Sequence, residues 1–150
     1  MHVVIAGCGR VGSGLARDLV TQGFDVSIID ESPEAFHLLG DDFPGEFVVG
    51  RALDWEVLRE AGIKTATAFV ACTDGDNTNI LTAQIAQKKY GIRCVVARVY
   101  DPMRAELFAQ LGINTVCPTR DGRGSIFDSV PARQPPLPNQ AGRGGFGLTF

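Results

Sequence analysis

The chain begins with a short apolar stretch, residues 3–6, that leads directly into a Gly-x-Gly-x-x-Gly motif formed by Gly7, Gly9 and Gly12. Apolar residues recur at helical spacing over residues 13–20, so the glycines mark the point where a strand turns into a helix. In this context Gly7 serves a tight turn, Gly9 allows a pyrophosphate to approach the backbone, and Gly12 allows the helix to pack on the strand. The N–H groups at the start of the helix attract phosphate.

An acidic residue follows the next expected strand, residues 25–29. Asp30 lies about 20 residues after the glycines, where a ribose-binding carboxylate is expected. A carboxylate there accepts hydrogen bonds from both ribose hydroxyls and repels a 2′-phosphate, which favours NAD or an adenine nucleotide over NADP. The plainer alternative is a tight turn over residues 7–12, with Asp30 as a helix cap ahead of Ser32 and Pro33. The complete series of strand, glycines, helix, strand and acid favours nucleotide binding.

Apolar and amphipathic stretches alternate along the chain to about residue 118. The expected strands are 3–6, 25–29, 46–49, 68–72, 94–97 and 115–117, and the expected helices are 10–21, 32–39, 54–61, 76–90 and 101–111. Alternation of this kind builds right-handed crossovers between parallel strands. It predicts an α/β fold, a Rossmann-like doubly wound parallel sheet of six strands in the order 3-2-1-4-5-6.

The composition excludes several classes of partner. The 150 residues suit one domain, and a net charge of −3 gives no basic surface for nucleic acid. No apolar run approaches the roughly 20 residues of a membrane span, and no signal peptide precedes the first strand. We therefore expect a cytoplasmic protein that does not insert into a membrane.

The four cysteines lie far apart in the sequence and form no C-x-x-C pair. Cys72, Cys94 and Cys117 fall within expected strands, where a free thiol behaves as a small buried apolar side chain. The chain has only two histidines to join them, so no metal site is expected. Cys8 lies in the glycine motif beside a helix N-terminus, which suggests a reactive thiol with a lowered pKa.

Other candidate residues follow the remaining strands, because ligands of doubly wound sheets bind at the carboxyl ends of the strands. Arg51 and Ala52 follow the third strand, and Thr73 and Asp74 follow the fourth. Arg98 follows the fifth strand, where its guanidinium suits an anion.

Arg10 is a further candidate because its positive charge is unfavourable at its expected place in the fold. Arg10 lies in the first turn of the expected helix 10–21, where a cation opposes the helix dipole. A bound phosphate removes that conflict, which makes Arg10 a candidate ligand contact. Thr73 and Asp74 have a plainer interpretation as loop residues ahead of Asp76, the expected cap of the helix 76–90.

Several blocks of the sequence resemble the N-terminal domain of TrkA-type proteins, also called the RCK (regulator of potassium conductance) domain. The blocks are 7–12, 50–54 with Leu58 and 61–63, 73–77 with Asn79, and 97–99. The resemblance covers residues 1 to about 118 and is far more specific than the glycine motif alone. TrkA-type proteins are the cytoplasmic regulatory subunits of bacterial Trk and Ktr potassium uptake systems.

The resemblance implies a domain without catalytic residues that binds NAD(H) or ATP/ADP and does not transform it. The family's nucleotide contacts fall on Gly7, Cys8, Gly9, Arg10, Val11, Gly12, Asp30, Arg51, Ala52, Thr73, Asp74 and Arg98. In ATP-binding relatives the arginine of the glycine loop reaches the terminal phosphate across a dimer, which assigns that role to Arg10. The resemblance also implies a homodimer or larger ring that gates a membrane-embedded potassium transporter subunit from the inner face of the plasma membrane.

Two features depart from the pattern of that family. The usual Gly-Asp-Ala is Gly50-Arg51-Ala52 here, which leaves the choice of nucleotide open. The expected division is a nucleotide-binding domain over 1–118, a short crossover helix within 119–131 and a flexible tail over 132–150. That remainder is too short for the family's C-terminal effector domain, so the chain is either truncated or works with a second, complete regulatory subunit.

The alternative function is a small NAD-dependent oxidoreductase, or the cofactor-binding half of one. Such an enzyme needs a substrate pocket and an acid or base near the nicotinamide. Neither His2, under the start of the first strand, nor His37, on an early helix, is expected at that place.

Overall fold

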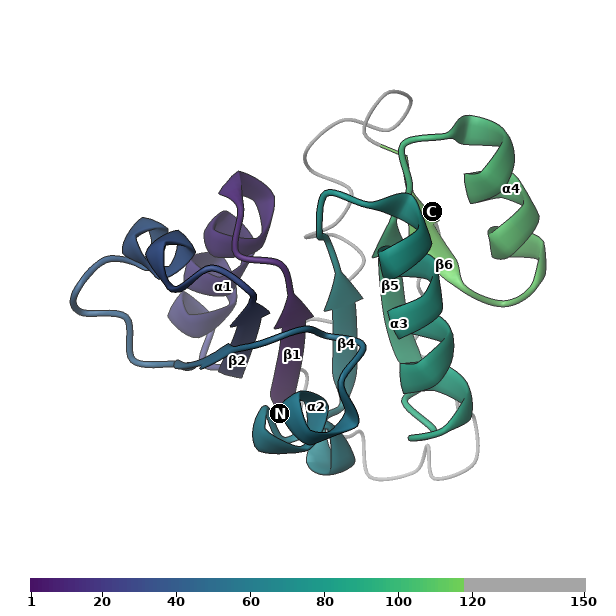
Figure 1. Cartoon of the computed structure of the whole chain (residues 1–150). Helices are drawn as coiled ribbons and strands as arrows, with labels where there is room; N and C mark the ends of the chain where they lie inside the picture. Colours follow the sequence, from purple (N-terminus) through teal and green to yellow (C-terminus); the bar gives the residue numbers. More distant parts are fainter. Residues whose placement is uncertain (118–150) are drawn as a thin grey trace.

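The computed structural model describes residues 1–117 as one parallel sheet with helices on both faces (Figure 1). The strands are β1 His2–Ala6, β2 Asp25–Asp30, β3 Glu46–Val49, β4 Ala68–Ala71, β5 Cys94–Arg98 and β6 Asn114–Val116. The α-helices are α1 Arg10–Thr21, α2 Trp55–Glu60, α3 Asp76–Lys88 and α4 Pro102–Gln110, and two 3₁₀-helices are η1 Pro33–Leu39 and η2 Ile63–Thr65. The helix expected within 119–131 and the tail expected over 132–150 lie outside the described residues.

The sheet has six parallel strands in the order β3-β2-β1-β4-β5-β6, which confirms the predicted fold class. The order reverses at β1, which pairs with β2 on one side and with β4 on the other. Connections from β1 to β3 and from β4 to β6 therefore run in opposite directions along the sheet. This arrangement opens a crevice at the carboxyl ends of β1 and β4.

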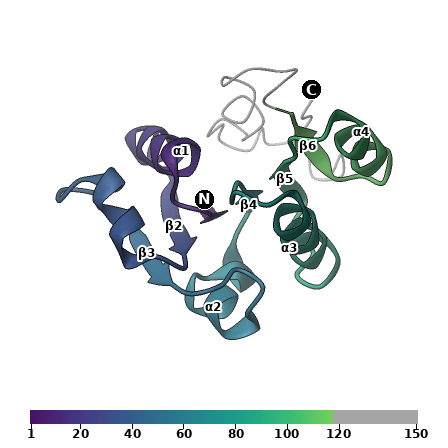
Figure 2. The same ribbon diagram turned by 45° about the horizontal axis from the view of Figure 1, so that its top comes forward.

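Alternate residues of each central strand enter two separate cores. Val4 and Ala6 of β1 belong to the core under α2, η2, α3 and α4, whereas Val3 and Ile5 belong to the core under α1 and η1. Figure 2 shows α1 on one side of the sheet, and α2 and α3 on the other. Strands β1, β4 and β5 are buried on both faces, as is usual for the central strands of a parallel sheet covered by helices on both sides.

The structure corrects several expected element boundaries. The segment after Pro33 forms a seven-residue 3₁₀-helix rather than an α-helix, and Gly40, with φ of +85°, follows it. The short helix η2 was not expected from the sequence. Strands β4 and β6 end at Ala71 and Val116, so Cys72 and Cys117 follow the strands, although both are buried as expected. None of the helices in residues 1–117 is long and apolar enough to cross a membrane.

Candidate functional site

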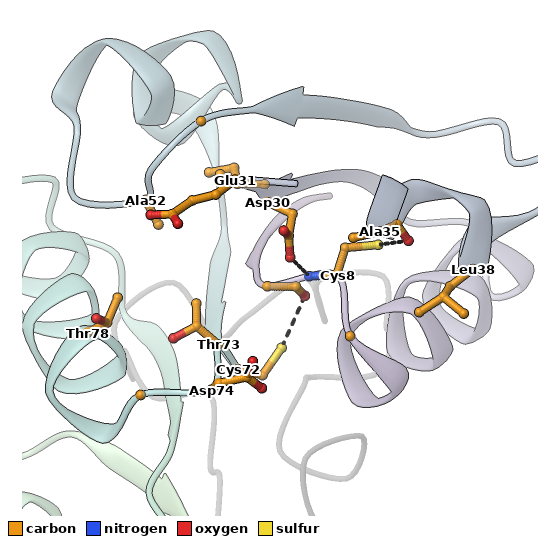
Figure 3. Close-up of a pocket in the computed structure, with 15 residues that line it drawn as sticks. Cys8, Asp30, Glu31, Ala35, Leu38, Ala52, Cys72, Thr73, Asp74 and Thr78 are labelled. Atoms are coloured by element: carbon orange, nitrogen blue, oxygen red, sulfur yellow. Dashed lines mark hydrogen bonds between the residues drawn. The ribbon is translucent and has the colours of Figure 1, made fainter. Parts of the chain in front are cut away.

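A cavity of about 480 Å³ lies at the carboxyl ends of the strands, beside the point where the strand order reverses (Figure 3). It is lined by the segments that follow β1, β2, β3 and β4, together with η1 and the first turn of α3. The lining residues are Gly7, Cys8, Gly9, Ile29, Asp30, Glu31, Ala35, Leu38, Gly50, Ala52, Cys72, Thr73, Asp74, Gly75 and Thr78.

The three motif glycines have three different environments. Gly7 has φ of +105°, and a Cβ on it would lie 2.7 Å from the carbonyl oxygen of Cys72. A Cβ on Gly12 would lie 1.8 Å from the carbonyl oxygen of Gly7, so only glycine lets α1 pack this closely on the loop. Gly9 differs from both, because a Cβ on it would meet nothing within 4 Å. The turn at Gly7 and the packing at Gly12 are as predicted, and the space at Gly9 is open to a ligand.

The loop leads into a helix N-terminus with no side-chain cap. Gly9 is the N-cap of α1, and the first helical hydrogen bond runs from the N–H of Ser13 to the carbonyl of Gly9. The first turn of α1 carries no acidic side chain, so its N–H groups and the positive end of the helix dipole have no negative side chain of that turn as partner. This end of α1 is therefore suited to an anion.

Asp30 joins the end of β2 to the glycine loop. Its Oδ2 accepts a hydrogen bond from the N–H of Cys8 at 2.8 Å, and its Oδ1 accepts one from the N–H of Ser32 at 2.9 Å. The second bond resembles the alternative interpretation, in which Asp30 caps the following turn. The first bond holds the carboxylate against the loop, and the remaining lone pairs of both oxygens are available to a ligand hydroxyl.

The thiol of Cys8 is not activated, which corrects the hypothesis of a lowered pKa. Cys8 is fully buried, and its Sγ donates to the carbonyl of Ala35 at 3.4 Å. Burial and the neighbouring Asp30 carboxylate raise the pKa of the Cys8 thiol to about 11. Among residues 1–117 no group of His, Cys, Asp and Glu side chains is arranged to hold a metal ion.

Thr73 and Asp74 form the wall of the cavity opposite Asp30 and Glu31 (Figure 3). Thr73 is fixed by the side chain of Asn79, which accepts hydrogen bonds from the Thr73 N–H at 2.8 Å and from its hydroxyl at 2.6 Å. The side chain of Asp74 is fully exposed. The carboxylates of Asp30, Glu31 and Asp74 all line the cavity, whereas none of its described lining residues is Lys, Arg or His.

Arg98 is buried behind Thr73 and does not line the cavity. Its Nη2 donates to the carbonyl of Thr73 at 2.8 Å and lies 3.8 Å from Oδ1 of Asp74. Its guanidinium also lies over the ring of Tyr100, 5.0 Å from the centroid. In this structure the side chain therefore supports the end of β4, and the expected contact with an anion stays a prediction.

The twelve predicted site residues divide between those that line the cavity and those that do not. Seven of the twelve line the cavity: Gly7, Cys8, Gly9, Asp30, Ala52, Thr73 and Asp74. The five others, Arg10, Val11, Gly12, Arg51 and Arg98, are not among its lining residues. Arg51 pairs with Glu31 through Nε and Oε1 at 3.1 Å, and both side chains are largely exposed. Arg10 is exposed at the start of α1.

Sequence reasoning missed some lining residues and misplaced one cap. Thr78 lines the cavity from the first turn of α3, Gly75 from the N-cap of that helix, and Leu38 from η1. The signal for Thr78 was its place in the first turn of the helix that follows a predicted strand. Asp76 does not cap its own helix, whose N-cap is Gly75. Instead its carboxylate accepts hydrogen bonds from the N–H groups of Tyr100 at 2.8 Å and of Asp101 at 3.1 Å, which fixes the segment after β5.

The same arrangement is found in a family of known proteins. Residues 3–119 match the model of the TrkA-N domain. The chain belongs to the TrkA-N domain family. Within residues 1–117, the glycine loop, Asp30 and the wall at Thr73 are therefore parts of a TrkA-N domain.

Individual relatives agree with this assignment. The chain is 51% identical over 120 residues to the Trk system potassium uptake protein TrkA of Streptomyces coelicolor, covering 80% of this chain and 54% of that protein. It also resembles the solved Kef CTD of Shewanella denitrificans in an AMP-bound form, with 30% identity and a TM-score of 0.71 over 84% of this chain and 77% of that one. The GsuK RCK domain has 26% identity and a TM-score of 0.66, over 85% of this chain and 27% of that one. The chain spans about half the length of the curated relatives it matches.

Proposed function

We propose that this chain is the nucleotide-binding part of a regulatory subunit of a TrkA-type potassium transport system. NAD(H) or ATP/ADP binds in the cavity at the carboxyl ends of β1, β2 and β4 and is not transformed there. Binding then shifts the subunit between arrangements that favour the open or the closed transporter. A ligand does this only if it binds one arrangement more tightly than the other.

One observation carries this proposal, the hydrogen bond of 2.8 Å between the N–H of Cys8 and the carboxylate of Asp30. It joins a carboxylate suited to ribose hydroxyls to a loop whose next N–H groups suit phosphate. A ligand in which ribose and phosphate are neighbours fits this combination. The AMP-bound Kef CTD, which is 30% identical to this chain, supports the choice of an adenine nucleotide.

The proposed contacts are assigned to the successive chemical groups of the nucleotide. We assign the phosphates to the loop of Gly7, Cys8, Gly9, Val11 and Gly12, the ribose to Asp30, the adenine side to Arg51 and Ala52, and the second edge of the ligand to Thr73, Asp74 and Arg98. Arg10 is assigned to a phosphate bound by a second copy of the chain, because its side chain is exposed and lies outside the cavity.

The proposed partners are a membrane-embedded potassium transporter subunit and other regulatory chains. The regulatory chains form a homodimer or a larger ring, with or without a second type of regulatory subunit. The name of the Streptomyces coelicolor relative, a Trk system potassium uptake protein, supports a potassium transporter as the partner. The chain then works in the cytoplasm, peripheral to the inner face of the plasma membrane.

A regulatory role fits the cavity better than the oxidoreductase alternative. The described lining residues include no His, Lys or Tyr to act as an acid or base, and both oxygens of Asp30 already accept backbone hydrogen bonds. His2 lies at the amino end of β1, away from the cavity, with its Nε2 2.9 Å from the carbonyl oxygen of Ala61. We therefore propose nucleotide binding without turnover.

The proposal is tested by calorimetric titration of the 150-residue chain with NADH, NAD, ATP, ADP and NADPH in parallel. The mass of the protein in solution is measured by light scattering before and after each titration. We expect binding of unphosphorylated dinucleotides or adenine nucleotides, weaker binding of NADPH, and a change of assembly on binding. Absence of binding to all five would show that the proposed function is wrong, and consumption of NADH with an added substrate would favour the oxidoreductase.

A further inference from the structure

Asn79 is a fully buried amide on the second turn of α3, and every hydrogen-bonding position of its side chain is used. Its Oδ1 accepts from the N–H of Thr73 at 2.8 Å and from the Thr73 hydroxyl at 2.6 Å. Its Nδ2 donates to the carbonyl of Thr73 at 2.9 Å and to the carbonyl of Arg98 at 2.8 Å. One side chain thus joins the segment after β4 to the last residue of β5.

These partners allow only one placement of the hydrogens. A backbone N–H can only donate and a backbone carbonyl can only accept, so the orientation of the Asn79 amide is determined by its backbone partners. Its Oδ1 carries no hydrogen, and therefore the Thr73 hydroxyl must donate its single proton to Asn79. The Thr73 oxygen then has only lone pairs left for a ligand in the cavity.

The same wall carries further acceptors and negative charge. The carboxylate of Asp74 follows Thr73 and is fully exposed at the cavity. Asp76 in the first turn of α3 offsets the positive end of that helix. The Arg98 guanidinium lies 3.8 Å from Oδ1 of Asp74, but its Nη2 donates to the carbonyl of Thr73 and the side chain does not line the cavity. The lining of this wall therefore favours a hydroxyl-bearing group over a phosphate, whereas the N–H groups of the glycine loop favour the phosphate.

We propose that Asn79 is a positioning residue that keeps Thr73 a pure hydrogen-bond acceptor, so that the β4 side of the cavity selects a ligand hydroxyl over a further phosphate. The proposal rests on the nucleotide-binding function proposed above and names the kind of nucleotide. Acceptors lie on both sides of the loop, at Asp30 and at Thr73 (Figure 3). The arrangement therefore favours a diphosphate with a hydroxyl-bearing group at each end over a nucleoside triphosphate.

The experiment compares ADP, ADP-ribose and ATP as probes by calorimetric titration of the full chain. ADP-ribose adds a second hydroxyl-bearing sugar to ADP, and ATP adds a phosphate. In the wild-type chain we expect ADP-ribose to bind about fivefold more tightly than ADP, the effect of one neutral hydrogen bond. ATP is expected to bind no more tightly than ADP.

Thr73→Val removes the hydroxyl but retains the branched shape and the backbone hydrogen bonds to Asn79. It is expected to abolish the preference for ADP-ribose over ADP. Thr73→Ser is the matched control and retains the preference. Asn79→Ala frees the Thr73 hydroxyl to donate, so the affinity for ATP relative to ADP-ribose rises in this variant and not in Thr73→Val. A purely structural role of Asn79 would weaken all three ligands together.

Two results would overturn the inference without affecting nucleotide binding itself. One is a wild-type chain that binds ATP more tightly than ADP-ribose. The other is a preference for ADP-ribose that survives Thr73→Val in a protein whose melting temperature is unchanged. If the wild-type chain binds none of the three probes, the proposed function fails and the inference fails with it.

Discussion

Replacing Gly9 by alanine is expected to weaken nucleotide binding without lowering the stability of the folded protein. Gly9 has φ of −82° and ψ of −162°, an extended conformation that alanine adopts without strain, and an added Cβ meets nothing within 4 Å. We therefore expect the free energy of unfolding of Gly9→Ala to be unchanged, or raised by up to ~1 kcal/mol because the unfolded chain becomes less flexible.

The affinity of this variant for a nucleotide is expected to fall. If a phosphate approaches the backbone at Gly9, the new methyl group occupies its space and at least one charge-assisted hydrogen bond is lost. Such a bond contributes about 1.5–3 kcal/mol, so nucleotide affinity should fall roughly 10- to 150-fold. The assay combines calorimetric titration with a denaturant unfolding curve for the same preparation.

The matched control lies in the same segment of the chain. A Cβ on Gly14 also meets nothing within 4 Å, but Gly14 lies inside α1 and does not line the cavity. Gly14→Ala should raise the free energy of unfolding by about 0.5–1 kcal/mol through helix propensity and leave nucleotide affinity unchanged. Wild-type affinity in a folded Gly9→Ala variant would refute the assignment of the phosphate to this loop.

Three further predictions concern the loop, the carboxylate and the thiols. Gly12→Ala should lower the free energy of unfolding by more than the ~1–3 kcal/mol typical of overpacking, because the new Cβ would lie 1.8 Å from the carbonyl oxygen of Gly7; a cooperative wild-type unfolding curve would contradict this. Asp30→Ala should weaken every ribose-containing nucleotide by about 1.5–3 kcal/mol in calorimetric titration, and equal affinities would show that the cavity binds its ligand differently. Burial raises the pKa of the thiols of Cys8 and Cys94 to about 11 and of Cys72 to about 12, above the ordinary value of 9.0, so the folded state holds protons that the unfolded state releases. Stability should therefore fall as the pH rises above about 9, measured as the denaturation midpoint at pH 8 and pH 10, and thiol labelling of the folded protein at pH 8 should be slow.

The sequence by itself determined the order of the sheet and the place of the loop. Both depend on local patterns: apolar runs that alternate with amphipathic helices, glycines at a strand-to-helix turn, and an acid at the end of the next strand. Gly7, Gly12 and Asp30 occupy their predicted places because these constraints act within about 30 residues of chain. The helix caps at Asp54 and Asp101 were also predictable, since each side chain accepts a hydrogen bond from an N–H two residues later.

Only the tertiary structure decided which strand-end side chains face the cavity. Arg98 is the last residue of β5, and its guanidinium donates to the carbonyl of Thr73, a residue 25 positions earlier, while its predicted contact with an anion stays a prediction. Asp76 was predicted to cap its own helix, yet it accepts from Tyr100, 24 positions later. A sequence pattern specifies that a polar residue follows a strand, but not which distant partner takes its hydrogen bonds.

The properties of Cys8 and Asn79 were also decided by the groups that surround each side chain in the folded molecule. Position beside a helix N-terminus suggested an activated thiol at Cys8, but burial and the Asp30 carboxylate raise its pKa. Asn79 stood in the sequence as part of a family motif, and its role emerges only where β4 and β5 meet. Desolvation and hydrogen-bond saturation depend on every group that packs around a side chain, so they are properties of the folded molecule and not of the sequence pattern.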